Sequence, residues 1–188
     1  MKWLLAVIIA YLIGAFPLHL WAVPRLSVAG RIPPPHALYP REAFLLVLID
    51  VVKGMAATLL AFGVAGWAGA CFAAVTVTLG SMYSVFLGFR GGRGLAVAAG
   101  ALLILSPVLM FIGVIIWLLS LAATRYLFLA SFFTTVGVIL LGLVFISQMT
   151  VWFVVLVLGV LILLRLRPGW KRFRRGLEPP YRFKNPFR

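Results

Sequence analysis

Cysteine and histidine are scarce in this sequence. Cys71 is the only cysteine, so no intrachain disulfide and no thiolate metal cluster can form, and its apolar surroundings suit a small buried side chain. The two histidines, His19 and His36, belong to no convincing Ser-His-Asp or Cys-His set. An enzyme that forms a covalent intermediate on serine or cysteine is therefore not expected.

Acidic side chains are almost as rare. Three Asp and Glu stand against 17 Lys and Arg in 188 residues, which gives a formal net charge of +14. Such an excess could indicate a nucleic-acid partner. The basic residues, however, lie at the borders of apolar runs and not on a soluble module. We therefore expect no nucleic acid and attribute the charge to membrane orientation.

Long apolar runs fill the rest of the chain. Hydrophobic residues make up 64% of it, more than a soluble domain of this length could bury. A bilayer core of about 30 Å requires about 20 helical residues. The runs that approach or exceed this length are roughly 3–23, 43–62, 68–88, 94–123, 127–146 and 150–164. The sequence predicts an all-α, polytopic membrane protein with one integral-membrane domain over residues 1–188, and its first run is a retained span and not a signal peptide.

The run over 94–123 is too long for one untilted span. Ser106-Pro107 lies near its middle, so it is one kinked helix or two short ones. Dividing it gives seven spans with the N-terminus outside, which places nearly all basic loop residues and the C-terminus in the cytoplasm. With six spans the basic segment 165–188 would lie outside. We predict seven, with 165–188 as a basic, aromatic cytoplasmic tail that either anchors the chain at the anionic leaflet or partly closes over a site.

Two charged residues lie inside the second run. Asp50 and Lys53, in "IDVVKG", are three apart and therefore neighbours on a helix. Ionisable groups at this depth are costly and are usually paired or functional. One interpretation is a structural ion pair. The other is that Lys53 faces an anionic substrate while Asp50 holds it in place.

A glycine-rich, doubly cationic stretch, "GFRGGRGL" at 88–95, separates two apolar runs. Its glycines, Gly91, Gly92 and Gly94, let the backbone approach a ligand closely. The next helix is expected to begin near Gly94 or Leu95, and its free N–H groups favour an anion. Arg90 and Arg93 add forked donors suited to phosphate. The stretch predicts a phosphate site at the cytoplasmic border, although a tight loop with orientation-setting arginines would look similar.

Several segments resemble the PlsY-type glycerol-3-phosphate acyltransferases. "GSMYSVFLGFRGGRGLAV" (80–97) is similar, without gaps, to that family's second motif, G-H-x-F-P-V-F-L-x-F-K-G-G-K-G-x-A-T. "AYLIGAFP", "IDVVKG", "LSPVL", "TRYLFLAS" and "PGWKRFRRGLE" also match family segments, in the same order along the chain. The resemblance covers nearly the whole sequence and implies the same seven-span topology.

The resemblance implies an enzyme of the bacterial plasma membrane. It would move a fatty acyl group from acyl phosphate to glycerol 3-phosphate, giving lysophosphatidic acid for phospholipid synthesis, with membrane lipids around it and without cofactor or metal. Positioning and electrostatics would supply the rate. By position in the motifs, Arg90, Arg93, Lys53 and Glu178 are the predicted catalytic residues. The predicted substrate-binding residues are Gly91, Gly92, Gly94, Asp50 and Ser81.

The chain also departs from the family's motifs. The first motif, H-G-S-G-N-x-G-A-T-N-V-x-R, is absent, and "GRIPPPHALYPRE" (30–42) takes its place. Four further family positions, His, Pro, Thr and Asn, are occupied here by Ser81, Ser84, Val97 and Gly169. One alternative is therefore a non-catalytic relative that binds an anionic lipid or a protein partner. A small transporter is a weaker alternative, because few polar residues could line a path.

Overall fold

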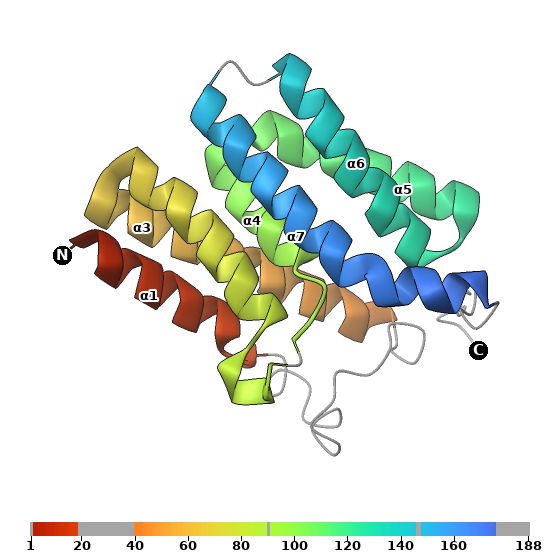
Figure 1. The fold of residues 1–188 in the computed structure, drawn as a ribbon, viewed down its shortest axis with the longest axis horizontal. Coiled ribbons are helices and arrows are strands. Elements are labelled where there is room, and N and C mark those ends of the chain that lie inside the picture. Colours follow the sequence, from red (N-terminus) through yellow and green to blue (C-terminus); the bar gives the residue numbers. More distant parts are fainter. Residues whose placement is uncertain (1, 19–39, 90, 146–147, 176–188) are drawn as a thin grey trace.

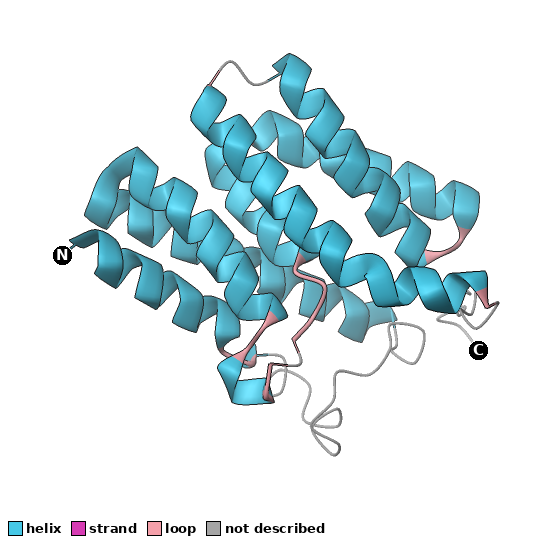
Figure 2. Ribbon diagram, viewed as in Figure 1, coloured by secondary structure: helices cyan, strands magenta, loops and turns pink. Residues whose placement is uncertain are grey.

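The computed structural model describes residues 2–18, 40–89, 91–145 and 148–175, which are helices and their connections with no strand among them (Figure 2). The elements are α1 (Lys2–Ala15), α3 (Pro40–Met82), the 3-10 turn η3 (Val85–Leu87), α4 (Leu95–Leu105), α5 (Pro107–Thr124), α6 (Leu127–Phe145) and α7 (Met149–Arg174). In Figure 1, α1 and α3 form one side of the bundle, α5 and α6 form the other, and α4 and α7 lie between them.

The longest element, α3, is two helices that fold back on each other. Gly66 breaks the helix, with φ 67° and ψ −163°. A Cβ added at Gly69 would lie 2.9 Å from the carbonyl oxygen of Ala61. Eight residues of straight helix would separate these positions by about 12 Å. The first arm (residues 40–65) and the second arm (residues 67–82) are therefore antiparallel, as the reversal of the chain in Figure 1 shows.

Within the described residues, four helical stretches are long and apolar enough to cross a membrane: 41–87, 107–124, 127–144 and 149–170. The first has 47 residues, about twice the length that one crossing requires. Two shorter apolar helices, α1 and α4, accompany them. The described part of the chain is thus all-helical, with several helices suited to cross a membrane, in agreement with the fold class expected from the apolar runs.

The charge distribution predicted that the run over 94–123 is divided into two helices. The structure contains two helices, because α4 ends at Leu105 and α5 begins at Pro107. Ser106 between them is not helical, with φ −156° and ψ 87°. Proline suits the first turn of α5, where its missing N–H costs nothing. Pro107 therefore starts a helix.

Glycines bring α1, α3 and α4 into close contact. A Cβ added at Gly14 would lie 2.1 Å from the Val77 carbonyl oxygen, and one at Gly80 would lie 2.3 Å from the Tyr11 carbonyl oxygen. The first arm of α3 meets α4 in the same way, through Gly54 and Gly100. In a bilayer, burial from water does not drive helices together. Small residues instead stabilise the contact by letting the backbones approach closely enough for dispersion attraction. These contacts hold α1, α3 and α4 in place relative to one another, and the cavity described below lies where they meet.

The last helix extends beyond its apolar part. α7 continues through Pro168 to Arg174, so the first ten residues of the predicted tail, 165–174, are helical. An aromatic cluster fastens this extension to α6. Phe128 lies 6.0 Å from Trp170 and 6.1 Å from Phe173 between ring centroids. The basic end of α7 is therefore a packed element at one end of the bundle.

Candidate active site

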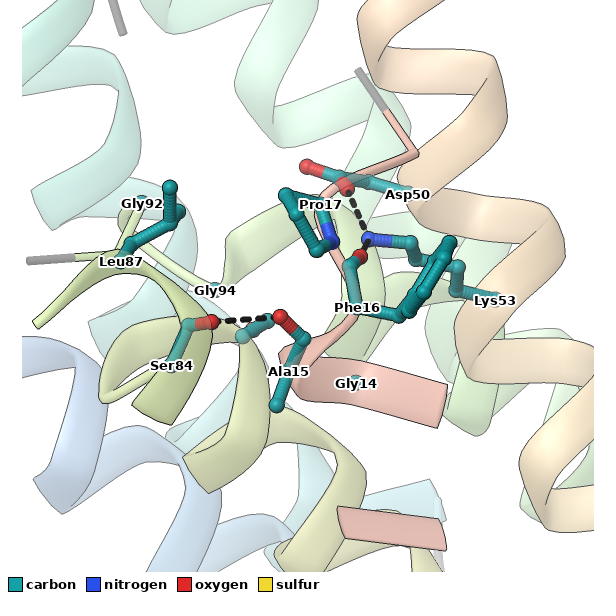
Figure 3. Close-up of a pocket in the computed structure, with 11 residues that line it drawn as sticks. Gly14, Ala15, Phe16, Pro17, Asp50, Lys53, Ser84, Leu87, Gly92 and Gly94 are labelled. Carbon is teal, nitrogen blue, oxygen red and sulfur yellow. Dashed lines mark hydrogen bonds and ion pairs between the residues drawn. The ribbon is translucent and has the colours of Figure 1, made fainter. Parts of the chain in front are cut away.

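A small cavity of about 30 Å³ opens where four parts of the chain meet (Figure 3). These parts are the end of α1, the first arm of α3, the end of its second arm with η3, and the glycine loop (residues 91–94). The lining residues are Gly14, Ala15, Phe16, Pro17, Asp50, Lys53, Ser81, Ser84, Leu87, Gly92 and Gly94. A cavity of this size has room for only a few small polar atoms.

Lys53 is the buried cation of this cavity, with 4% of its surface exposed. Its Nζ donates a hydrogen bond to the carbonyl oxygen of Phe16 and lies 3.9 Å from Oδ1 of Asp50 (Figure 3). Phe16 follows the last turn of α1, where carbonyl groups lack helical partners and the helix dipole is negative. Lys53 therefore joins α1 to α3, and its charge is only partly balanced by the 40% exposed Asp50.

Hydroxyl groups make two further connections at the end of α1. Ser84, with 1% exposed, donates from Oγ to the carbonyl oxygen of Ala15. The hydroxyl of Tyr11 donates to the carbonyl oxygen of Tyr83 at 2.8 Å. Both connections join α1 to the segment that follows the second arm of α3. The wall of the cavity formed by α1 is thus held by hydrogen bonds at its carbonyl end.

The glycine loop is fastened to the end of α3 through its own N–H groups. Gly91 donates to the carbonyl oxygen of Met82, and Gly92 donates to that of Ser81, each at 3.1 Å. A Cβ at Gly91 would lie 2.1 Å from the Ser81 carbonyl oxygen, so only glycine fits there. A Cβ at Gly92 would meet nothing within 4 Å, because that side of the loop faces open space.

Gly94 makes the turn into α4. Its φ of 74° is left-handed, and a Cβ there would lie 2.5 Å from Cε of Met82. The first N–H groups of α4, at Leu95 to Val97, have no earlier turn to bond to and carry the positive end of the helix dipole. Gly94 lines the cavity, and half-buried Arg93 precedes it. The donors and positive charge at this wall suit an anion.

Arg165 reaches the glycine loop from α7. Its Nη2 donates to the Gly91 carbonyl oxygen at 2.8 Å, and its Nε donates to the Gly92 carbonyl oxygen at 3.3 Å. Its guanidinium carbon lies 5.2 Å from the ring centroid of Tyr83. Sequence reasoning placed Arg165 only at the start of the basic tail. Arg165 and the loop are more than 70 residues apart along the chain, so no local sequence pattern indicated this contact.

The structure brings five of the predicted site residues to one cavity: Asp50, Lys53, Ser81, Gly92 and Gly94. Gly91 packs behind it against α3, and Arg93 lies between two lining residues. Arg90 and Glu178 lie outside the described residues. The sequence did not assign the end of α1 or Ser84 to the site.

The residues that replace the family's motif positions have local partners. Ser81 donates from Oγ to the Thr78 carbonyl oxygen at 2.8 Å, while Ser84 bonds to α1. Val97 is fully buried in the α1–α3–α4 contact. A Cβ at Gly169 would lie 2.6 Å from Cδ2 of Phe128, so this position faces the aromatic cluster. An asparagine there would displace packed rings.

Comparison with known proteins gives one consistent result. The model of the family "Glycerol-3-phosphate acyltransferase" matches residues 37–176. The glycerol-3-phosphate acyltransferase of Aquifex aeolicus is 33% identical over 190 aligned residues, which cover 95% of this chain and 98% of the relative. Glycerol-3-phosphate acyltransferase 2 of Moorella thermoacetica is 33% identical, covering 94% and 96%.

Solved structures agree with the sequence comparisons. The crystal structure of PlsY (YgiH), an integral membrane glycerol 3-phosphate acyltransferase, in its glycerol 3-phosphate form is similar with a TM-score of 0.87 and 29% identity. The similarity covers 97% of this chain and 96% of that one. The lysophosphatidic acid form matches equally well, with a TM-score of 0.87.

Proposed function

The chain belongs to the glycerol-3-phosphate acyltransferase family, and we propose that it transfers a fatty acyl group from acyl phosphate to glycerol 3-phosphate within the bacterial plasma membrane. It is an integral membrane acyltransferase. The non-catalytic alternative is not favoured, because the relatives are named glycerol-3-phosphate acyltransferases and the similarity covers almost their full length. The donor, the acceptor and the site residues are the parts that we propose.

The reaction needs little covalent chemistry from the protein. The 1-hydroxyl oxygen of glycerol 3-phosphate attacks the carbonyl carbon of the acyl phosphate. The bond between that carbon and the phosphate oxygen breaks, the hydroxyl proton passes to the departing phosphate, and the products are lysophosphatidic acid and inorganic phosphate. Because acyl phosphate is already activated, orientation and charge stabilisation are the main requirements.

One observation carries this proposal: buried Lys53 and Gly94, the residue that immediately precedes α4, line the same cavity. We propose that Lys53 and the first N–H groups of α4 bind phosphate oxygens, with Arg93 adding positive charge beside them. Asp50 would hold the Lys53 ammonium group, and Ser81 would contact the acceptor. Arg90 and Glu178 are proposed as further ligands from their motif positions alone. The cavity would have to widen to admit a phosphate group.

We also propose the orientation of the chain. Counting the two arms of α3 separately and including α1 and α4 gives seven crossings, with the N-terminus outside and the basic segment 165–188 in the cytoplasm. The support is the charge distribution, since this arrangement places Arg93, Arg125 and the basic end of α7 on one side. Glycerol 3-phosphate would then enter from the cytoplasm.

The direct test is turnover by the purified, full-length protein in lipid nanodiscs. Palmitoyl phosphate and radiolabelled glycerol 3-phosphate are supplied, and lysophosphatidic acid and inorganic phosphate are measured. The expected result is equal formation of both products without added metal or cofactor. Product formed from palmitoyl coenzyme A but not from palmitoyl phosphate would contradict the proposed donor. Binding of lysophosphatidic acid without turnover, by protein shown to be folded, would favour the non-catalytic alternative.

A further inference from the structure

We propose that Arg165 is a positioning residue that holds the glycine loop in the shape that the phosphate site requires. This inference rests on the proposed function, because it assigns Arg165 a part in substrate binding. It concerns a residue of α7 that does not line the cavity. Its guanidinium group acts through the loop and not on the substrate.

The guanidinium group binds two successive carbonyl groups of the loop. Nη2 and Nε of Arg165 donate to Gly91 and Gly92, at 2.8 Å and 3.3 Å. The N–H groups of the same two glycines donate to the end of α3. The loop is therefore fastened on both sides of its backbone, to α3 through its donors and to α7 through its acceptors. Because glycine has no side chain, the conformation of these two residues depends on such backbone hydrogen bonds.

Tyr83 orients the guanidinium group. The cation lies over its ring at 5.2 Å from the centroid, a distance at which cation and ring attract each other. The backbone of Tyr83 is itself held by the hydroxyl of Tyr11 on α1. The planar fork of arginine can stack on a ring and bind two carbonyl groups at once, which lysine cannot do. This geometry accounts for an arginine at position 165.

The contact matters for binding because of what the loop carries. Gly92 and Gly94 line the cavity, Arg93 lies between them, and α4 begins directly afterwards. If the carbonyl groups of Gly91 and Gly92 were released, these donors and charges would no longer be fixed relative to Lys53. Misplacement of a binding group by about 1 Å can cost on the order of 100-fold in rate.

The test compares Arg165→Ala and Arg165→Lys with Arg167→Ala. Arg167 is exposed on the same helix two residues further on, so it controls for the loss of one basic residue. Initial rates are measured in nanodiscs against glycerol 3-phosphate concentration. We expect Arg165→Ala to raise the KM at least tenfold, Arg165→Lys to restore part of the loss, and Arg167→Ala to stay within twofold of wild type. A smaller folded fraction would scale the maximal rate and leave KM unchanged.

A second measurement does not depend on turnover. Hydrogen exchange is followed in peptides that cover residues 88–95 for the same proteins. Arg165→Ala should speed exchange in this segment, while Arg167→Ala should leave it as in wild type. Equal KM and equal exchange in Arg165→Ala and Arg167→Ala would overturn the inference. If the wild type formed no product, the proposed function would fail, and the exchange rates alone would decide whether Arg165 holds the loop.

Discussion

At the scale of single residues, Lys53 has a structural partner and a place in the cavity at once. It hydrogen-bonds the end of α1 and also lines the cavity where we propose that phosphate binds. The sequence offered these as alternatives, an ion pair or a substrate ligand. The structure contains the ion pair with Asp50, but that pair leaves Lys53 beside the cavity, so the two roles are compatible.

Separating the two roles requires one single and one double substitution. Lys53→Met should lower activity about 100-fold or more, as expected for loss of one charge-stabilising donor. It should also lower the free energy of unfolding by about 1–3 kcal/mol, because the Phe16 carbonyl group loses its partner and Asp50 loses its counter-charge.

The double variant Asp50→Asn/Lys53→Met should recover part of the stability, because no unpaired carboxylate is left. It should remain inactive. Denaturant titration in detergent and acyl-transfer rates measure the two effects. Recovery of activity together with stability would show that Lys53 is only structural.

Gly92 and Gly94 provide a second test at this scale. Gly94→Ala should cost about 1–2 kcal/mol, since alanine is strained at φ 74° and its Cβ would meet Met82. Gly92→Ala should fold as wild type does, because its Cβ would meet nothing within 4 Å. Gly92→Val should fold too but lose activity if phosphate approaches the loop there. Unchanged turnover in Gly92→Val, with thermal unfolding and acyl transfer measured together, would place the substrate elsewhere.

At the scale of elements, the helix contacts depend on glycines that meet a neighbouring backbone. Gly100→Ala should lower the free energy of unfolding by about 1–3 kcal/mol, because its Cβ would lie 2.0 Å from the Val51 carbonyl oxygen and no side chain can move aside.

Gly63→Ala is the matched control, since nothing lies within 4 Å of that Cβ. It should be neutral or stabilising by up to about 1 kcal/mol. Denaturant unfolding of both variants in the same detergent measures the difference. Equal stability would mean that α3 and α4 are not in the close contact described.

Most elements could be predicted from the sequence because lipid imposes a simple length rule on apolar runs. The starts of α4 and α5 could also be predicted, because Gly94 and Pro107 each favour a helix start through their own backbone conformation. The C-terminal end of α7 could not be predicted from the sequence. Hydropathy falls at Arg165, which marks a membrane border and says nothing about where the helix ends. Its packing on Phe128 is a contact between distant segments that no local pattern encodes.

At the scale of the whole molecule, the site combines groups of two kinds. Lys53, Asp50 and the glycine loop were found from sequence because charge and glycine are unusual within apolar runs. The Ala15 and Phe16 carbonyl groups and Arg165 were not, because backbone acceptors carry no sequence signal and the partner of an arginine depends on the fold. The sequence thus singled out charged residues that line the cavity, while the structure adds the contacts that hold them.

The orientation of the whole chain can be tested by labelling. With Cys71 replaced by alanine, a cysteine is introduced at Met149 or at Ala123, both of which are exposed. An impermeant maleimide should label Met149→Cys in intact cells, because this end of α7 is predicted to lie outside. Ala123→Cys, next to Arg125, should be labelled only after permeabilisation. The reverse pattern would contradict the predicted topology, as would a reporter fused after Arg188 that reads as extracytoplasmic.

The hydrogen bonds from Arg165 to the glycine loop also have a consequence for biosynthesis. The two ends of this contact are 73 and 74 residues apart in the chain. At 5–20 residues per second, the ribosome needs on the order of ten seconds to make that stretch. During this interval Gly91 and Gly92 have been synthesised, but the arginine that binds their carbonyl groups has not. If Arg165 positions the loop as we propose, catalytic competence would arise only after α7 has been translated.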